Sequence, residues 1–337
     1  MTEVLEEIIK DHCGICVSHS LHDTHSMMKA LQHRGREGAG IFFLGERRLD
    51  AIKWVGSVDM FDLADFYKML PMKEYHTFAG HVRYATLGRK DKILEDAHPH
   101  VIGGKVIDRG NHLIILDCEA ALVHNGQINP EYLKEIEKSK IKTGCDTEAL
   151  LHFFRKNSEA GLLEKIPGSY TLAIADRRMK DVIVIRDRNG LKPGVLGWKD
   201  GKYVMASEDI ALEKNGADFI ENLTPGSVYY LEPEGEYKEK HIVDSKPHYC
   251  FFEWNYIANV KSIINRRGVG IIRENLGEAL AKEFIPKDAD LVSFLPRCPA
   301  SAARIYAKKA GLKSIITSAQ EPVPILSIHK ILRVEER

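Results

Sequence analysis

The stretch CGICVSH at residues 13–19 places a cysteine directly before a short apolar run typical of a β-strand, and behind an acidic leader. Taken alone, Cys13 has three interpretations: a catalytic nucleophile, half of a Cys-x-x-Cys pair with Cys16, or a small residue buried in a strand. A metal or redox pair is disfavoured, because no second Cys-x-x-Cys follows and the other cysteines are scattered singly. The motifs downstream decide between the other two.

The composition indicates an ordinary globular protein. Among its 337 residues, 48 Lys and Arg balance 48 Asp and Glu, so we expect no net field that attracts nucleic acid or an anionic membrane. No apolar run has transmembrane length, and residues 1–12 lack the apolar block of a signal peptide. Six cysteines without framework spacing suit a reducing compartment. The sequence therefore predicts a cytoplasmic protein of about two domains.

The pattern of apolar residues changes once along the chain. Up to about residue 241, short strand-like runs dominate and only a few helical stretches occur, such as 23–32 and 146–156, which favours a layered α+β domain. After a charged, proline-flanked segment, helix-like and strand-like stretches alternate as in a parallel α/β unit. We therefore predict a leader at residues 1–12, a first domain at 13–245 and a smaller domain at 246–337.

Four motifs follow the cysteine in a fixed order: LQHRGREGAGI (31–41), GHVRYATLG (80–88), LVHNGQIN (122–129) and CDTEALLHF (145–153). Together they resemble the class II glutamine amidotransferases, whose fold is the four-layer αββα sandwich of the N-terminal-nucleophile hydrolases. The Tyr in GHVRY, with VIRDRNGLKPGVLG (184–197) and VMASEDIAL (204–212), is most similar to the glutamine phosphoribosylpyrophosphate amidotransferases of purine synthesis. The resemblance covers about residues 13–311.

The resemblance implies a catalytic role for three residues. Hydrolysis of the glutamine side-chain amide needs a nucleophile, a base and an oxyanion site. Cys13 supplies the thiolate, and removal of the leader would free an α-amino group, with a pKa of roughly 8, that takes the thiol proton. Asn125 and Gly126 correspond to the oxyanion donors. On its own, the Asn-Gly pair is more typical of a hairpin turn.

The free amino-acid head of glutamine needs a planar cation for its carboxylate and a carboxylate for its ammonium group. By resemblance these are Arg83 and Asp146, with Thr86 as an additional contact. Arg34 and Gly35 correspond to residues that line the same pocket. The alternative is that Arg83 and Asp146 are surface charges, as single charged residues usually are.

Four histidines lie close to these motifs. His81 and His124 are expected to point away from the key residues that follow them and to support the structure. His98 and His100 in DAHPH have metal-like spacing, but two imidazoles without further ligands are more often loop residues. We predict neither a metal nor another cofactor.

The resemblance fails in the C-terminal part. The phosphoribosyltransferase domain of these enzymes carries a Thr/Gly-rich phosphate-cradling loop that does not occur here, and where they have Pro-Asp-Ser-Gly this chain has PRCP at 296–299. We therefore expect a folded but partial phosphoribosyltransferase-like domain that does not bind phosphoribosylpyrophosphate productively.

The preferred hypothesis is a glutamine amidotransferase that releases glutamate and ammonia through a Cys13 thioester, with an unknown ammonia acceptor. One alternative is full amidophosphoribosyltransferase activity, alone or with a partner chain. Another is a non-catalytic regulatory or scaffold protein, which would need none of the site residues. Glutamine, an ammonia-accepting partner protein and a second copy of the chain are the expected partners.

Overall fold

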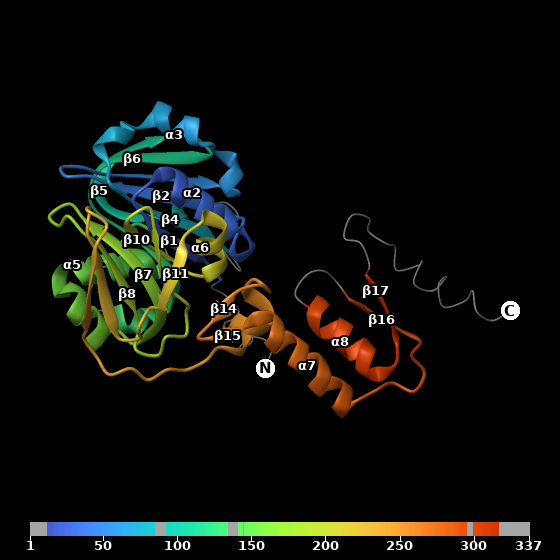
Figure 1. Cartoon of the computed structure of the whole chain (residues 1–337). Helices are drawn as coiled ribbons and strands as arrows, with labels where there is room; N and C mark the ends of the chain where they lie inside the picture. Colours follow the sequence, from blue (N-terminus) through green and yellow to red (C-terminus); the bar gives the residue numbers. More distant parts are fainter. Residues whose placement is uncertain (1–11, 85–91, 134–140, 144, 295–298, 317–337) are drawn as a thin grey trace.

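The computed structural model of the chain (Figure 1) describes residues 12–84, 92–133, 141–143, 145–294 and 299–316. Most of the leader, Thr86 and residues 296–298 of PRCP therefore lie outside the described residues. In the described part of the chain, no helix is both long and apolar enough to cross a membrane.

The N-terminal part contains two groups of antiparallel strands that are joined along the 17-residue strand β6 (His112–Ile128). The first group has the order β11 (Asp218–Asn222), β9 (Val195–Lys199), β10 (Lys202–Ala206), β1 (Gly14–Ser18), β4 (Thr77–Arg83), β2 (Gly38–Leu44) and β3 (Leu49–Val55). The second runs from β6 through β7 (Gly168–Asp176), β8 (Val182–Arg186) and β12 (Ser227–Leu231) to β13 (Tyr237–His241), with β5 (His100–Asp108) also paired to β6. The first half of β6 pairs with β3, and its second half pairs with β7.

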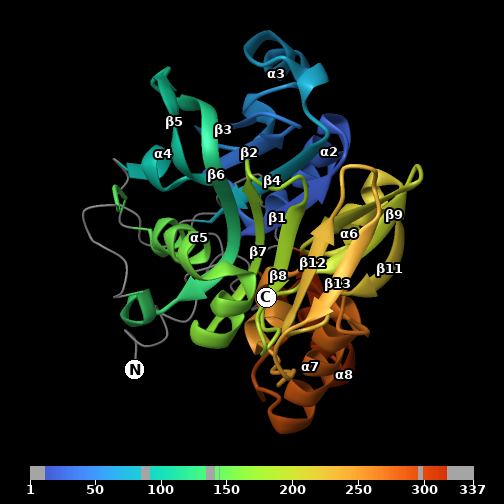
Figure 2. The ribbon, with the colours of Figure 1, turned by 90° about the vertical axis from the view of Figure 1, so that its left-hand side faces the viewer.

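Three hydrophobic clusters lie between the layers of helices and strands. Figure 2 shows the course of these layers as a ribbon. The first lies between the first strand group and the helices α2 (Leu21–Ala30), α3 (Leu63–Met69) and α6 (Asp209–Asn215). The second, which we call the inter-sheet layer, contains alternate residues of both strand groups, such as Ile15 and Val123. The third lies between the second group and α5 (Asp146–Lys165). This order confirms the predicted α+β, four-layer αββα architecture.

The predicted helices are present with shifted ends. The helix expected at 23–32 begins at Leu21, because the side chain of Ser20 caps it by accepting a hydrogen bond from the backbone N–H of Asp23. The helix expected at 146–156 extends to Lys165, although the left-handed backbone of Ser158 (φ 64°) interrupts it. Short helical turns complete this part of the chain: Gln32–Arg34, Val58–Met60, Met72–Glu74, Ile93–Asp96 and Pro130–Leu133.

Residues 242–250 contain neither helix nor strand and lead to the C-terminal part, which lies to one side of the sandwich in Figure 1. It contains η7 (Glu253–Ile257), the short strands β14 (Ile263–Ile264) and β15 (Arg267–Gly268), α7 (Val269–Glu283), β16 (Leu291–Phe294), α8 (Ala300–Ala310) and β17 (Lys313–Ile316). β16 and β17 are parallel, as expected for an α/β unit, and α7 packs on α8. Two of these elements contact the sandwich: η7 contacts Arg34 through Glu253, and β14 contacts Asp209 of α6 through Ile263.

Candidate active site

Cys13 directly precedes β1, and only 5% of the residue is exposed. Gly14 pairs with Val82 of β4, so Cys13 and Arg83 lie at the same end of adjacent strands. Ile15 and Val17 belong to the inter-sheet layer. Because side chains alternate along a strand, the same two-residue period directs Cys13 toward that layer as well.

Cys16 faces the opposite way. It lies in the cluster under α2, where its Sγ donates to the carbonyl oxygen of Thr24 over 3.6 Å and burial raises its pKa to about 12. None of the described cysteines is in a disulfide. Cys16 belongs to the cluster under α2 and Cys13 does not, so the two residues do not form a Cys-x-x-Cys pair.

Arg34 fixes the backbone of Cys13. Its Nε donates a 2.9 Å hydrogen bond to the carbonyl oxygen of Cys13, and its side chain is completely buried. Gly35 packs against the end of β4, where a Cβ atom would lie only 2.4 Å from the carbonyl oxygen of Arg83. The sequence analysis expected both residues to line the substrate pocket. In the structure, the Arg34 guanidinium is turned away from solvent and contacts the backbone of Cys13 and two glutamates.

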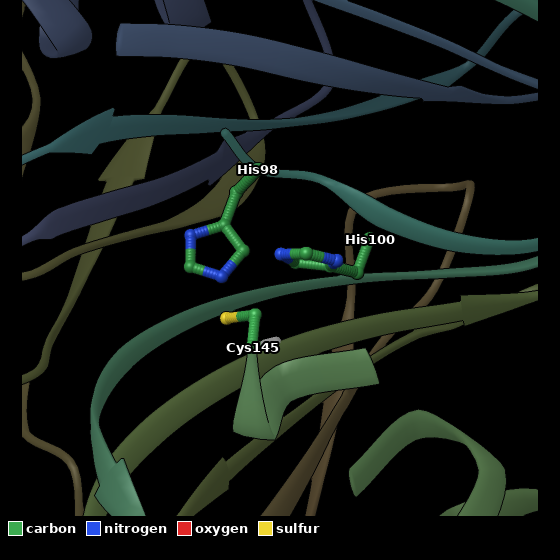
Figure 3. A group of neighbouring side chains, drawn as sticks. All are labelled: His98, His100 and Cys145. Carbon is green, nitrogen blue, oxygen red and sulfur yellow. The ribbon is translucent and has the colours of Figure 1, made fainter. Parts of the chain in front are cut away.

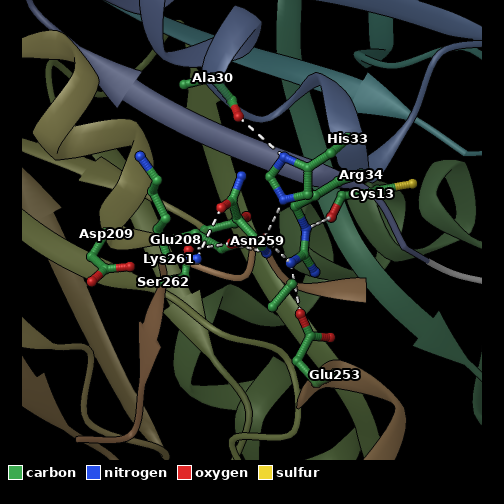
Figure 4. A network of polar contacts seen from close by, with 12 residues as sticks. Cys13, Ala30, His33, Arg34, Glu208, Asp209, Glu253, Asn259, Lys261 and Ser262 are labelled. Carbon is green, nitrogen blue, oxygen red and sulfur yellow. Dashed lines mark hydrogen bonds and ion pairs between the residues drawn. The ribbon is translucent and has the colours of Figure 1, made fainter. Parts of the chain in front are cut away.

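Two glutamates share the Arg34 guanidinium (Figure 4). Nη1 lies 2.5 Å from Glu208 Oε1 and 2.6 Å from Glu253 Oε1. Burial alone would lower the pKa of Arg34, but the two carboxylates raise it overall. Burial alone would raise the pKa of Glu208. The positive charge of Arg34 outweighs this effect and holds that pKa far below its usual range. Arg34 and Glu208 are therefore both charged at neutral pH.

Glu208 also links the sandwich to the C-terminal part. Its Oε1 accepts from Nε2 of His33 at 2.8 Å. Its Oε2 accepts from the backbone N–H of Asn259 at 2.9 Å and from Oγ of Ser262 at 2.6 Å. The segment that begins at η7 is thus tied, through one carboxylate and Arg34, to the carbonyl group of Cys13 (Figure 4).

Asn125 is completely buried on β6, and neither its Oδ1 nor its Nδ2 has a hydrogen-bond partner among the described residues. It is two residues from Val123 of the inter-sheet layer, so its amide faces the same layer as Cys13. Gly126 has φ +150°, and a Cβ atom there would lie 2.0 Å from the carbonyl oxygen of Ser169. Only glycine fits this approach of β6 to β7. The pair belongs to a continuous strand and not to the hairpin turn considered above.

Arg83 and Asp146 come from opposite strand groups. Arg83 ends β4, its Nη2 lies 3.5 Å from Asp96 Oδ2, and its buried Nη1 has no hydrogen-bond partner in the described part of the chain. Asp146 begins α5, and its Oδ2 accepts from the backbone N–H of Ile128 at 2.9 Å. The side chain of Arg83 is largely buried and Asp146 is half-buried, so neither is a solvated surface charge.

A chain of buried histidines connects β4 to Asp146. Nε2 of His81 lies 3.0 Å from the carbonyl oxygen of His124 and 2.7 Å from Nδ1 of His98. Since a carbonyl only accepts, His81 carries its proton on Nε2 and His98 accepts on Nδ1. His98 then donates through Nε2 to Oγ1 of Thr147, which donates in turn to Oδ1 of Asp146.

Burial keeps these imidazoles neutral. It lowers the pKa of His81 to about 3 and holds that of His98 well below its usual range. His124, whose pKa burial also lowers, points away from Asn125 as expected and contacts Oγ1 of Thr147 at 2.9 Å. The expectation that His81 points away from its key neighbour was wrong, because it is two residues from Arg83 and therefore on the same face of β4.

A second group of side chains lies beside this network. His98, His100 and Cys145 come together although 45 residues separate His100 from Cys145, and their ligand atoms all lie within 4.8 Å of one another (Figure 3). Burial raises the pKa of Cys145 to about 12. Lys53 is buried nearby and donates to the carbonyl oxygens of Glu95 and Ala97 at 2.7 and 2.9 Å. The sequence analysis noted the histidines but not their third neighbour.

Comparison with known proteins finds matches to both a family model and curated relatives. A family model described as a glutamine amidotransferase domain matches residues 107–214. The amidophosphoribosyltransferases of Staphylococcus aureus (strain Mu50) and Bacillus subtilis (strain 168) are 30% and 31% identical over 302 and 299 residues, each 86% of this chain. These matches span 57% and 59% of the relatives, so the chain covers less than two thirds of their length.

A solved structure is similar over nearly the whole chain. The glutamine phosphoribosylpyrophosphate amidotransferase from B. subtilis, solved with ADP and GMP, superposes with a TM-score of 0.73 at 26% identity. The match covers 95% of this chain and 70% of that one. The likeness therefore extends beyond the sandwich into the C-terminal part.

Proposed function

The chain is a homologue of the class II glutamine amidotransferases, and among them of the amidophosphoribosyltransferases, and we propose that it hydrolyses the side-chain amide of glutamine to glutamate and ammonia. One observation carries this proposal. Asn125 is completely buried without a hydrogen-bond partner among the described residues, and it faces the same layer as Cys13. A buried amide is nearly always hydrogen-bonded, so one left open beside a buried thiol suits a ligand oxygen.

In the proposed reaction, the Cys13 thiolate attacks the amide carbon of glutamine and the carbonyl oxygen becomes an oxyanion. The Asn125 amide and the Gly126 N–H stabilise that charge. Protonation of the leaving nitrogen releases ammonia and leaves a thioester, which water then hydrolyses to glutamate and the free thiol. Arg34 holds the Cys13 carbonyl throughout and touches no reacting atom.

The head group of glutamine is assigned to Arg83 and Asp146, with Thr86 as an additional contact to its carboxylate. Arg83 offers a buried Nη1 that has no partner in the described part of the chain. Asp146 presents a carboxylate whose position is fixed by Ile128 and Thr147. These two charges match the carboxylate and ammonium groups of a free amino acid.

The base is the α-amino group of Cys13, once residues 1–12 have been removed. His12 is itself buried, and its ring lies 5.1 Å from that of Tyr84, beside a pocket of about 410 Å³ where the sandwich meets the C-terminal part. Mass spectrometry of the active enzyme should find Cys13 as its first residue. An intact leader on fully active enzyme would contradict this assignment.

The nucleophile is tested by Cys13→Ala, with Cys16→Ala as its matched control. Cys13→Ala should abolish glutamate release, whereas Cys16→Ala should keep it, because Cys16 faces the helix layer. Circular dichroism establishes that both variants are folded. Full activity of Cys13→Ala would place the nucleophile elsewhere.

The names of the relatives favour a second candidate, amidophosphoribosyltransferase activity in purine synthesis. We propose instead that residues 246–337 form a partial phosphoribosyltransferase-like domain, because PRCP at 296–299 removes the acid and the hydroxyl found in the family. Ammonia would then pass to a partner protein in the cytoplasm, and the domain would pair two copies of the chain. Phosphoribosylpyrophosphate consumption that matches glutamate release would establish the second candidate.

A further inference from the structure

His98, His100 and Cys145 have the chemistry of a metal site. Two imidazoles and one thiol converge from β5, the turn before it and the start of α5, with their ligand atoms within 4.8 Å of one another (Figure 3). His98 and His100 are 5% and 2% exposed. The three residues are thus held on different elements of one packed core and do not come from a mobile loop.

One donor of this group is unused. Nε2 of His100 is buried and has no hydrogen-bond partner among the described residues. In Figure 3, the outer ring nitrogen of His100 faces His98, and a ring nitrogen of His98 faces the sulfur of Cys145. Because a buried polar atom without a partner is costly, the free nitrogen suggests a ligand at this point.

We propose that His98, His100 and Cys145 bind a Zn²⁺ ion. Imidazole nitrogen and thiolate sulfur are preferred by borderline-soft divalent ions, whereas Mg²⁺ and Ca²⁺ take oxygen ligands. Bonds of about 2.0 Å to nitrogen and 2.3 Å to sulfur bring tetrahedral donors to about 3.3–3.6 Å apart. Small side-chain rotations from the observed spacing achieve this, and the fourth position is left to water.

The ion would act on Arg83 and Asp146, the pair assigned to the head group of glutamine, which we call the substrate clamp. This effect rests on the proposed function. His98 donates through Nε2 to Thr147, and Thr147 in turn holds Asp146. Zn²⁺ binding to Nε2 of His98 and to Cys145 releases the Cys145 proton to solvent and moves the His98 proton from Nε2 to Nδ1, which removes the bond to Thr147. Nδ1 of His98 then donates to Nε2 of His81, and His81 moves its own proton to Nδ1, which has no partner among the described residues. Asp146 directly follows Cys145, and its Oδ1 lies 3.6 Å from that sulfur. Zn²⁺ should therefore weaken glutamine binding.

The test is a Co²⁺ titration of the full metal-stripped chain, followed by competition with Zn²⁺. One equivalent should give visible bands of a four-coordinate site and a near-ultraviolet thiolate-to-metal band, which reports the cysteine directly. Cys145→Ala and His100→Gln should each lower the affinity at least about tenfold. Cys250→Ser and Cys13→Ala should leave the spectrum unchanged, and thermal melting identifies any variant that fails to fold.

The outcomes separate the two proposals. Zn²⁺ should raise the KM for glutamine in the unmodified chain but not in His100→Gln. This result would support both the metal site and its coupling to the substrate clamp. Binding without any glutamine hydrolysis would remove the proposed function and leave the metal site. Absence of binding, or equal affinity in folded Cys145→Ala and His100→Gln, would overturn the metal site.

Discussion

The Nε atom of Arg34 donates a 2.9 Å hydrogen bond to the carbonyl oxygen of Cys13, from a guanidinium that is completely buried between Glu208 and Glu253. The residue at the candidate nucleophile position is therefore fixed by a charge that also holds the C-terminal part.

Replacement of this charge should be severe. Arg34→Met leaves two carboxylates buried without their cation, and we expect the free energy of unfolding to fall by about 3–5 kcal/mol. The matched control is Lys29→Met, which also removes one positive charge but breaks only the exposed pair with Asp59 and should cost less than about 1 kcal/mol. Urea denaturation measures both. Equal losses would mean that the buried cluster adds no stability.

Arg83→Lys should raise the KM for glutamine with little change in kcat. Lysine keeps the charge but loses the planar fork that binds a carboxylate through two hydrogen bonds. The exposed Arg178, replaced by lysine in the same way, should have no effect. Steady-state kinetics distinguishes the two, and an unchanged KM would remove Arg83 from the clamp.

Asn125→Ala should instead lower kcat, by roughly a hundredfold or more, because one oxyanion donor is typically worth about 3–4 kcal/mol. The buried amide has no partner among the described residues, so its removal leaves no other group unpaired and the fold should persist. Single-turnover glutamate release and a melting curve measure the two effects. Normal turnover would contradict the oxyanion assignment.

Stability should fall in mild acid. The pKa of His81 is lowered from 6.5 to about 3 by burial, so below pH 6.5 the unfolded chain takes up a proton that the folded chain does not. The stabilisation is complete above pH 6.5 and is lost toward pH 3, at up to about 1.4 kcal/mol per pH unit for this group. His98 and His100 add losses of the same sign.

Urea denaturation between pH 7 and pH 5 measures this slope. His81→Gln should reduce it, whereas His22→Gln, which replaces a side chain that is 72% exposed, should not. A stability independent of pH in this range would show that the buried imidazoles titrate normally.

The layered architecture could be predicted from the sequence because each strand is marked by a local run of apolar residues. Alternate residues of a strand belong to different clusters, as Ile15 and Cys16 do. The order of the motifs indicated the family and, with it, the αββα arrangement of the layers. The same alternation predicts that Cys13 and Asn125 face one layer, because Cys13 is two residues from Ile15 and Asn125 is two residues from Val123.

The supporting contacts did not follow from the sequence. Arg34 lies 174 residues from Glu208 and was assigned to the substrate pocket, since no local pattern marks a buried ion pair formed across the fold. Cys145 was read as part of a motif and not as a neighbour of His100, because only the pairing of β5 with β6 and the packing of α5 bring them together.

The carboxylate of Asp146 is held from two directions, by the backbone of Ile128 at the end of β6 and by Thr147 at the end of the histidine chain. Its orientation is therefore set when the protein folds and does not have to be set when a ligand arrives. An amino acid that docks its ammonium group here loses its own freedom but orders little of the protein. Under the proposed function, selectivity among amino acids must then come from the far end of the side chain, which is assigned to Asn125.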